Sequence, residues 1–185
     1  MLFSSRNASA RAVETGSEDA ALVSAARSGD RDAFGQLYDR YAPMVHGLLL
    51  ARAPRGEVDD LVQDVFLLAL RRLDTLREDA RFGPWLAAIA RNRANDFHRR
   101  APDLTELPED LAAEDLREAE ALAILTAIRT LPDAYRETLV LRLVEGMTGP
   151  EIAARTGLTP ASVRVNLHRG LKQLREKLGR NDTHE

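Results

Sequence analysis

The sequence predicts an all-α protein made of two small helical domains joined by an acidic linker, with a helix-turn-helix in the second domain. Apolar residues recur at the three- and four-residue spacing of amphipathic helices, and no segment shows the alternation of a β-strand. Aromatic residues make up only 5% of the chain, which favours compact helical units over a β-sandwich. Near the C-terminus, a short helical pattern, a glycine and a longer helical pattern follow one another in the order of a helix-turn-helix.

The length of the chain allows this division. A chain of 185 residues can hold one ordinary domain or two small ones. We expect a flexible tail over 1–17, a first helical domain over 18–100, an acidic linker over 101–118, a second helical domain over 119–179, and a short tail over 180–185.

Charge is segregated along the chain, although the formal net charge is only −3. Residues Ala101–Glu120 carry eight acidic side chains against Arg117, a net charge of −7, and contain two prolines. By contrast, Arg81–Arg100 carries a net charge of +4 and Arg142–Arg180 a net charge of +5. Two basic lobes on an acidic tether are typical of a protein that binds nucleic acid.

The first domain begins with two helical patterns. Ser17 is a plausible N-cap for the first, which stops at Gly29, and Asp30 can cap the second. Pro43 falls inside the second pattern and is expected to kink or break it. The apolar stripe of this helix comprises Ala33, Phe34, Leu37, Tyr38, Tyr41, Val45, Leu48 and Leu49.

The next predicted helix starts near Asp59. Its expected core face is Val62, Val65, Phe66, Ala69, Leu70 and Leu73, and its opposite face is Asp60, Gln63, Asp64 and Leu67. Two carboxylates at i and i+4 disfavour an isolated helix slightly, so Asp60 and Asp64 call for an explanation. The helix dipole explains Asp60 but barely Asp64, whereas a basic partner surface explains both. The spacing leaves both readings open.

A further helix is predicted from Gly83-Pro84 to Arg100, with proline at a favourable first position. Its mostly apolar side is Leu86, Ile89, Ala90, Arg93 and Phe97, and its polar side is Asn92, Asp96, Arg99 and Arg100. Arginines and amides on one face suit contacts with phosphates and bases, although cations at a solvated helix end are also favourable. Phe82, in the preceding loop, is the candidate for stacking on an unpaired base, whereas Trp85 is expected in the core.

The second domain opens with two helices and closes with the helix-turn-helix. The apolar residues of the first two are Leu122, Leu125, Ile128 and Leu131, then Tyr135, Leu139, Val140 and Leu143. Thr148 and Glu151 have the spacing of a capping box, Gly157 suits the tight turn, and Thr159 can cap the last helix. That helix has a buried stripe of Val163, Leu167, Leu171, Leu174 and Leu178, and an outer face of Arg164, Val165, His168, Arg169 and Lys172. The basic outer face favours entry into a DNA groove over a purely structural hairpin.

No enzymatic site is predicted. The chain has no cysteine, no glycine-rich phosphate loop and no nucleophile elbow, and its four histidines (46, 98, 168 and 184) are scattered. We therefore expect no metal and no cofactor. No apolar run approaches the length of a membrane span or of a signal-peptide core, so we expect a cytoplasmic protein without membrane insertion.

Several stretches together carry a resemblance to a known family. They are DAFGQLYDRYAPMV, DDLVQDVF, RFGPWLAAIARNRANDFHRR and the final helix-turn-helix, over roughly residues 18–100 and 120–178. In this order and spacing they resemble the bacterial extracytoplasmic-function (ECF) sigma factors, in the minimal form with regions 2 and 4 only. DLVQDVF beside WLAAIARN is the specific part of the match.

The resemblance implies a non-enzymatic subunit that binds core RNA polymerase and directs promoter recognition and melting. Its implied partners are promoter DNA, the β′ clamp and β flap of polymerase, and an anti-sigma factor, because family members are commonly held inactive by one. The acidic linker would thread the RNA channel of polymerase. The implied site residues are Asp60, Gln63, Asp64 and Phe66 for the β′ clamp; Arg81, Phe82, Asn92, Asp96, Arg99 and Arg100 for the −10 element; and Arg164, Asn166, His168, Arg169 and Lys172 for the −35 element.

Two departures from the family pattern limit the reading of the promoter. Gly149-Pro150 replaces a more usual polar-acidic pair, and Val165-Asn166 stands where a small-basic pair is common. The promoter sequence is therefore not predicted. The nearest rival is a helix-turn-helix regulator that binds duplex DNA as a homodimer, and the next is a helical interaction module without a DNA role.

Overall fold

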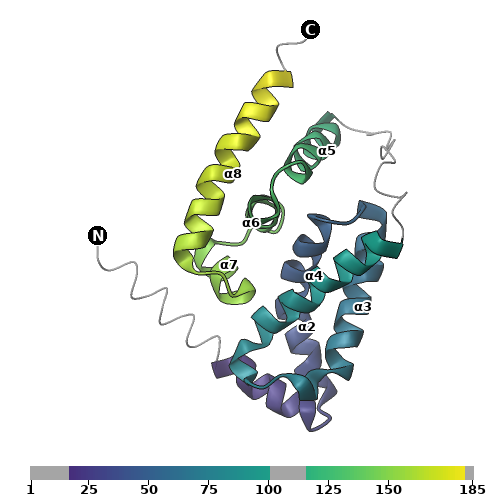
Figure 1. The fold of residues 1–185 in the computed structure, drawn as a ribbon. Coiled ribbons are helices and arrows are strands. Elements are labelled where there is room, and N and C mark those ends of the chain that lie inside the picture. The colour runs from purple at the N-terminus through teal and green to yellow at the C-terminus, as the bar shows by residue number, and fades with distance from the viewer. Residues whose placement is uncertain (1–16, 101–115, 182–185) are drawn as a thin grey trace.

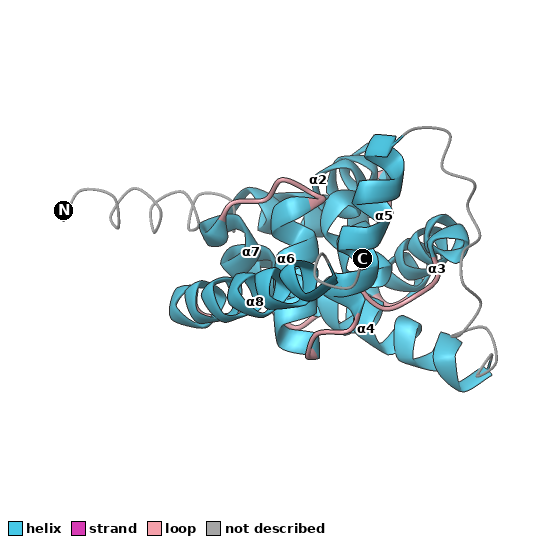
Figure 2. Ribbon diagram, turned by 90° about the horizontal axis from the view of Figure 1, so that it is seen from above, coloured by secondary structure: helices cyan, strands magenta, loops and turns pink. Residues whose placement is uncertain are grey.

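The computed structural model describes residues 17–100 and 116–181, and in both ranges the regular structure is helical, without a strand (Figures 1 and 2). This confirms the predicted all-α class. After a helical segment over residues 17–27 come α2 (Arg31–Leu50), α3 (Val58–Arg71), α4 (Phe82–Arg100), α5 (Leu116–Arg129), α6 (Asp133–Leu143), α7 (Gly149–Thr156) and α8 (Pro160–Asn181). Three short 3-10 turns, Arg55–Glu57, Leu73–Thr75 and Asp79–Arg81, lie between α2 and α4.

The predicted tails and linker lie mostly outside the described residues, which exclude 1–16, 101–115 and 182–185. The last three positions of the predicted linker, 116–118, are already helical and begin α5. None of the helices in the described ranges is long and apolar enough to cross a membrane.

We call the described residues 17–100 lobe 1 and the described residues 116–181 lobe 2. In lobe 1, the side chain of Asp30 caps α2 by accepting hydrogen bonds from the backbone N–H groups of Asp32 and Ala33. α2 then runs unbroken through Pro43, so of the predicted kink or break the structure rules out the break. The carbonyl that Pro43 leaves without a donor belongs to Asp39, and both residues are exposed to water, which can satisfy it.

Helix α3 packs against both α2 and α4. Its buried face follows the i, i+3, i+4 series from Val58 through Leu61, Val62, Val65, Phe66 and Ala69. Leu70 falls outside this series and is 47% exposed, so its predicted place in the core is wrong. Leu61, which the sequence-based assignment omitted, is buried instead.

Helix α6 lies in the middle of the molecule, between α8 and lobe 1 (Figure 1). Because it packs against α8 on one side and α2 on the other, Leu139, Val140 and Leu141 are all fully buried. Leu143, predicted on the apolar stripe, is 48% exposed. A single stripe was therefore the wrong pattern for a helix that is covered on two sides.

The two lobes share one continuous hydrophobic core. α2 contacts α6 and α7, and α4 contacts α7. At Gly47 the helices are so close that an added Cβ would lie 2.8 Å from both Leu141 Cδ2 and Glu145 Cγ in lobe 2. At Gly83 it would lie 2.9 Å from the backbone oxygen of Arg155. This close association of the lobes was not predicted from the sequence.

Candidate protein and nucleic-acid interfaces

The outer face of α3 places acidic, amide and apolar side chains in contact with solvent. Asp60 and Gln63 are exposed, and the side chain of Asp64 is 47% exposed while it forms an ion pair with Arg93 of α4. Leu67, 52% exposed, lies one turn beyond Gln63 and Asp64 on the same face. Such a face, with carboxylates beside an exposed leucine, is suited to a protein partner that carries basic and apolar groups.

Phe66 does not belong to this face but is buried, as its place on the predicted core face of the helix indicated, so its position does not support the polymerase contact that the resemblance implied. It is 3% exposed, and its ring centroid lies 6.4 Å from that of Phe34 and 4.5 Å from that of Tyr38. The helical period turns Phe66 inward with Val62, away from Gln63 and Leu67. Asp64 also differs from expectation, because it already has an intramolecular cationic partner in Arg93.

A polar groove of about 540 Å³ runs between α3 and the second half of α4. It brings together three of the residues predicted for the −10 element, Asn92, Asp96 and Arg99, with Asp96 and Arg99 joined in an ion pair. Arg72 and Asn95 line the same groove, and the sequence analysis did not include them among the site residues. The repeated arginines at the end of α3 were the available signal for Arg72. Arg100 is exposed at the end of α4.

The loop before α4 does not offer an aromatic ring to a base. Phe82 is 0% exposed and packs edge-to-face against Tyr41, with ring centroids 5.2 Å apart, and against Trp85 at 5.8 Å. The predicted stacking role of Phe82 is therefore wrong for this conformation, because Phe82 is the first residue of α4 and faces the core. Arg81, its neighbour, is exposed.

Helices α7 and α8 form the predicted helix-turn-helix. The capping box is present, with the backbone N–H of Thr148 donating to Glu151 Oε2 at 2.8 Å and the N–H of Glu151 donating to Thr148 Oγ1 at 3.4 Å. Gly157 ends α7 with φ +79°, a left-handed conformation that favours glycine. Thr159 then caps α8 by accepting a hydrogen bond from the N–H of Ser162 at 3.1 Å.

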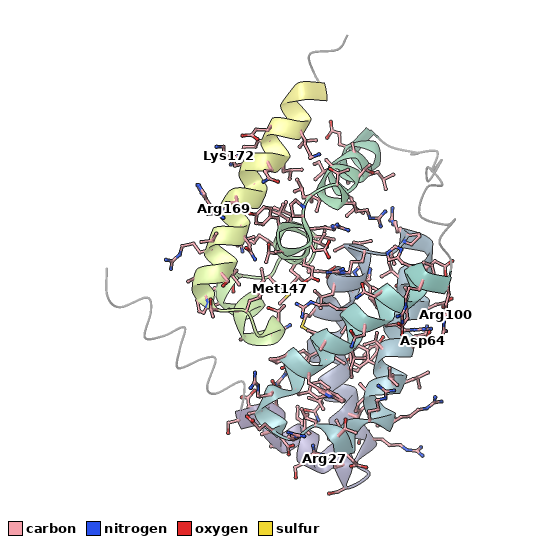
Figure 3. All side chains as sticks on the ribbon, viewed as in Figure 1. Arg27, Asp64, Arg100, Met147, Arg169 and Lys172 are labelled. Atoms are coloured by element: carbon pink, nitrogen blue, oxygen red, sulfur yellow. The ribbon has the colours of Figure 1, made fainter. Side chains whose placement is uncertain are left out.

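The basic side of α8 faces solvent. Arg164, His168, Arg169 and Lys172 are exposed, and Figure 3 shows Arg169 and Lys172 on the side of α8 that faces away from α6. Asn166 differs, because it is half-buried and lies one turn before the buried Gly170. The structure thus groups four of the five predicted −35 residues and leaves Asn166 at the edge of the group.

Between the lobes, the structure places a cluster of buried charges that the sequence analysis missed. Glu137 of α6 is 6% exposed and is bound by Arg52 and Arg91 of lobe 1. Burial opposes the charge of Arg52, but the hydrogen bonds and negative charges of Glu137 and Asp133 outweigh it and raise the pKa of Arg52. Glu137 lies off the apolar stripe that the sequence suggested for α6, so only its tertiary neighbours identify it.

A second polar contact joins the lobes at His46. Its Nδ1 lies 2.7 Å from Glu145 Oε1. The hydrogen bond to Glu145 outweighs partial burial and raises the pKa of His46. The other described histidines have different surroundings: Nε2 of His98 donates to the carbonyl oxygen of Arg52 at 2.5 Å, and His168 is exposed on α8. His184 lies outside the described residues. In the described ranges, no group of three or more acidic or histidine side chains is placed to hold a metal ion.

The fold and these surfaces define the class of a helical, helix-turn-helix DNA-binding protein, and comparison with known proteins gives the family. The sequence family of sigma-70 region 2 matches residues 37–102, and the sequence family of sigma-70 region 4 matches residues 121–174. The chain therefore belongs to the ECF RNA polymerase sigma factors, as the following relatives also show.

The RNA polymerase sigma factor CarQ of Myxococcus xanthus is 37% identical over 162 residues, which cover 83% of this chain and 93% of CarQ. The ECF RNA polymerase sigma-E factor of Escherichia coli K12 is 32% identical over 183 residues, covering 86% of this chain and 94% of the relative. Among solved structures, that of CnrH in complex with the cytosolic domain of CnrY matches with a TM-score of 0.64 and 29% identity, covering 91% of this chain and 99% of the matched chain in that structure.

Proposed function

We propose that this sigma factor docks on core RNA polymerase through the outer face of α3, holds the −10 element along α4 and reads the −35 element with α8. The observation that carries the proposal is that a carboxylate-bearing face on α3 and a basic helix-turn-helix face on α8 are both open to solvent in one chain. A DNA-binding regulator that acts without polymerase has no use for the α3 face.

The docking contact involves the β′ clamp. Asp60, Gln63 and Asp64 supply its polar part, and Leu67 adds an apolar contact that Phe66, being buried, does not supply. Mixed charged and apolar faces give both orientation and affinity at protein interfaces. The second lobe contacts the β flap. Polymerase forms the phosphodiester bonds, and we assign no catalytic step to the chain itself.

The −10 element is held by the groove between α3 and α4. Arg72 and Arg99 provide cations for phosphates, and Asn92 and Asn95 provide amides for base edges. On α8, Arg164, His168, Arg169 and Lys172 contact the −35 duplex. Because these tasks require polymerase and the chromosome, we place the protein in the cytoplasm.

A protein partner that covers these surfaces would hold the sigma factor inactive. We propose an anti-sigma factor in this role, supported by the likeness to CnrH, whose structure contains the cytosolic domain of CnrY. Whether such a partner separates the lobes or clamps them together is decided by co-purification followed by measurement of the distance between the lobes.

The test of the proposed function is transcription in vitro with core RNA polymerase on genomic fragments. We expect the added protein to start transcripts at new sites that core polymerase alone does not use. If no fragment shows redirected initiation, the proposal is wrong. Duplex binding as a homodimer, without polymerase, would instead support the independent regulator.

Arg169→Ala tests the −35 surface. We expect weaker binding to the −35 duplex, with the dependence of log K on log salt shallower by about 0.9, because one phosphate contact is lost. Arg175→Ala is the matched control, since Arg175 is exposed on another face of the same helix. Equal losses in both variants would remove Arg169 from the site.

A further inference from the structure

The carboxylate of Glu137 is held by two arginines in a manner that uses both of its oxygens. Oε1 accepts hydrogen bonds from Arg52 Nε at 3.1 Å, Arg52 Nη2 at 2.8 Å and Arg91 Nε at 3.1 Å. Oε2 accepts from Arg91 Nε at 3.0 Å and forms an ion pair with Arg91 Nη2 at 3.0 Å. The arginine side chains are 14% and 28% exposed, so the cluster is largely shielded from water.

The charges of this cluster are divided between the lobes. Arg52 follows α2 and Arg91 lies on α4, so both cations belong to lobe 1. Glu137 belongs to α6, as does Asp133, which forms an ion pair with Arg52 at 2.9 Å. If the lobes separate, both acids leave with α6, and the two guanidinium groups remain side by side on lobe 1 without these partners.

Lobe 1 itself holds both arginines near the proposed −10 groove. His98 of α4 donates a hydrogen bond to the backbone oxygen of Arg52, which ties the end of α2 to α4. Arg91 lies one turn before Asn95, a residue that lines the groove. The forked donors of two adjacent guanidinium groups match a phosphate as well as they match a carboxylate.

We propose that Arg52 and Arg91 form a nucleic-acid phosphate site on lobe 1, which the carboxylate of Glu137 occupies while the lobes are together. The inference rests on the proposed function of lobe 1 in holding a promoter strand, and it extends the −10 surface beyond the groove to a position that α6 covers. It follows that the closed arrangement and phosphate binding at this site exclude one another. With the lobes together, the chain therefore makes fewer phosphate contacts with DNA than it makes with the lobes apart.

The test uses the full chain and a labelled single-stranded DNA of mixed sequence, with affinity measured by fluorescence anisotropy over a series of salt concentrations. Glu137→Gln keeps the shape of the side chain and removes its charge. Glu120→Gln is the matched control, because it makes the same change of charge at an exposed position on α5. We expect Glu137→Gln to bind more tightly than the control, with a salt dependence steeper by about 1.4, the value for two added phosphate contacts on a single strand.

A second variant opens the lobes without altering any charge. Gly47→Leu places its side chain where Leu141 and Glu145 now lie, so it is expected to separate α6 from α2 and to give the same steeper salt dependence. Adding Arg91→Gln to either variant should remove about half of the increase in salt dependence, because one of the two phosphate contacts is lost. An inter-lobe fluorescence distance, measured on the same samples, reports the separation.

An unchanged salt dependence in both Glu137→Gln and Gly47→Leu overturns the proposal, whatever the distance between the lobes. An increase in salt dependence that Arg91→Gln does not reduce also overturns the proposal. The wild-type chain is assayed in parallel for polymerase-dependent transcription: activity there together with an unchanged salt dependence means that the phosphate site alone is wrong, whereas no activity means that the proposed function fails.

Discussion

Several charged side chains in the described parts of this protein join segments that are distant in sequence. Asp64 of α3 binds Arg93 of α4, and Arg27 of the first helical segment donates to the backbone oxygens of Leu73 and Leu76. A half-exposed pair such as Asp64–Arg93 contributes at most about 1 kcal/mol. Asp64 is therefore free to serve a partner with little loss of stability.

Because the Asp64–Arg93 pair adds little stability, Asp64→Arg should affect docking on polymerase more than it affects folding. Reversing the charge should reduce affinity for core polymerase at least about tenfold, equivalent to about 1.4 kcal/mol, while lowering Tm by only a few degrees. Binding is measured with labelled core enzyme and stability by thermal unfolding. Asp39→Arg, an equal change at an exposed position on α2, should bind core normally. Wild-type affinity in Asp64→Arg would contradict the docking role of the α3 face.

We expect His46 to give the closed arrangement a pH dependence. The pKa of His46 is raised above its ordinary value chiefly by Glu145, with Asp59 adding to the effect and Arg55 opposing it. A raised pKa means that the protonated form favours the closed state, so this contribution is fully present below about pH 6.5 and is lost as pH rises through the raised pKa. We expect the inter-lobe distance to increase over that interval.

The measurement is an inter-lobe fluorescence distance across the pH series, together with the NMR titration of the His46 ring. His46→Gln should remove most of the pH dependence, because Gln does not titrate. A distance that is constant with pH in the wild type, or a pH dependence that persists in His46→Gln, would show that another group controls it.

At the scale of whole helices, close packing is achieved at glycines. Gly170 of α8 is buried against α6, and an added Cβ would lie 3.0 Å from Leu139 Cδ1 and 3.2 Å from Tyr135 Cβ. Leu139 is fully buried and has little room to move. The long α8 can therefore keep its basic face in solvent while its other face lies directly on α6.

Gly170→Ala should for this reason destabilise lobe 2. Overpacking costs about 1–3 kcal/mol, and the better helix propensity of Ala returns up to about 1 kcal/mol, so we expect a net loss of about 1 kcal/mol and a Tm lower by roughly 2–4 °C. Gly35→Ala is the control, since Gly35 is exposed in α2 with open space around it, and it should raise stability. A higher Tm in Gly170→Ala would show that α6 and α8 adjust without strain.

At the scale of the whole molecule, lobe 2 satisfies groups that lobe 1 leaves open. α2 has no basic residue in its last turn, and Arg129 of α5 donates to the backbone oxygens of Leu50 and Ala53 at its end. Arg155 of α7 donates to the backbone oxygen of Arg40 at 2.8 Å and lies over the ring of Tyr41. These contacts are polar and can be exchanged for water or for a partner, which suits the opening of the lobes that the proposed phosphate site requires.

Arg155→Ala should shift the molecule toward the open state. The lost charged hydrogen bond and cation–π contact are together worth about 2 kcal/mol, which changes the closed-to-open ratio about 30-fold. Small-angle scattering should report a larger radius of gyration. Arg31→Ala, at an exposed position on α2, serves as the control and should leave it unchanged. An unaltered radius in Arg155→Ala would assign closure to the apolar contacts alone.

Much of the candidate site could be predicted because its signals are local. Caps, glycine turns and the spacing of apolar residues act within a few positions, and they identified the helix-turn-helix and the exposed face with Arg164 and Arg169. Periodicity also placed Phe66 correctly on the buried face of α3, whereas the resemblance implied a contact with polymerase that its buried ring does not offer. Phe82 was assigned to a loop but is buried at the start of α4, because an aromatic beside polar neighbours can face either way until the packing partners are known.

The sequence by itself determined the helical class, the caps of α2, α7 and α8, and the separation of charge along the chain, since each depends on neighbours within one or two turns. Only the tertiary structure decided that the lobes pack together, that α6 is covered on two sides, and that Glu137 meets Arg52, 85 positions away in the sequence. The physical reason is that burial and ion pairing between distant segments depend on which helices come into contact, and local spacing does not specify those contacts.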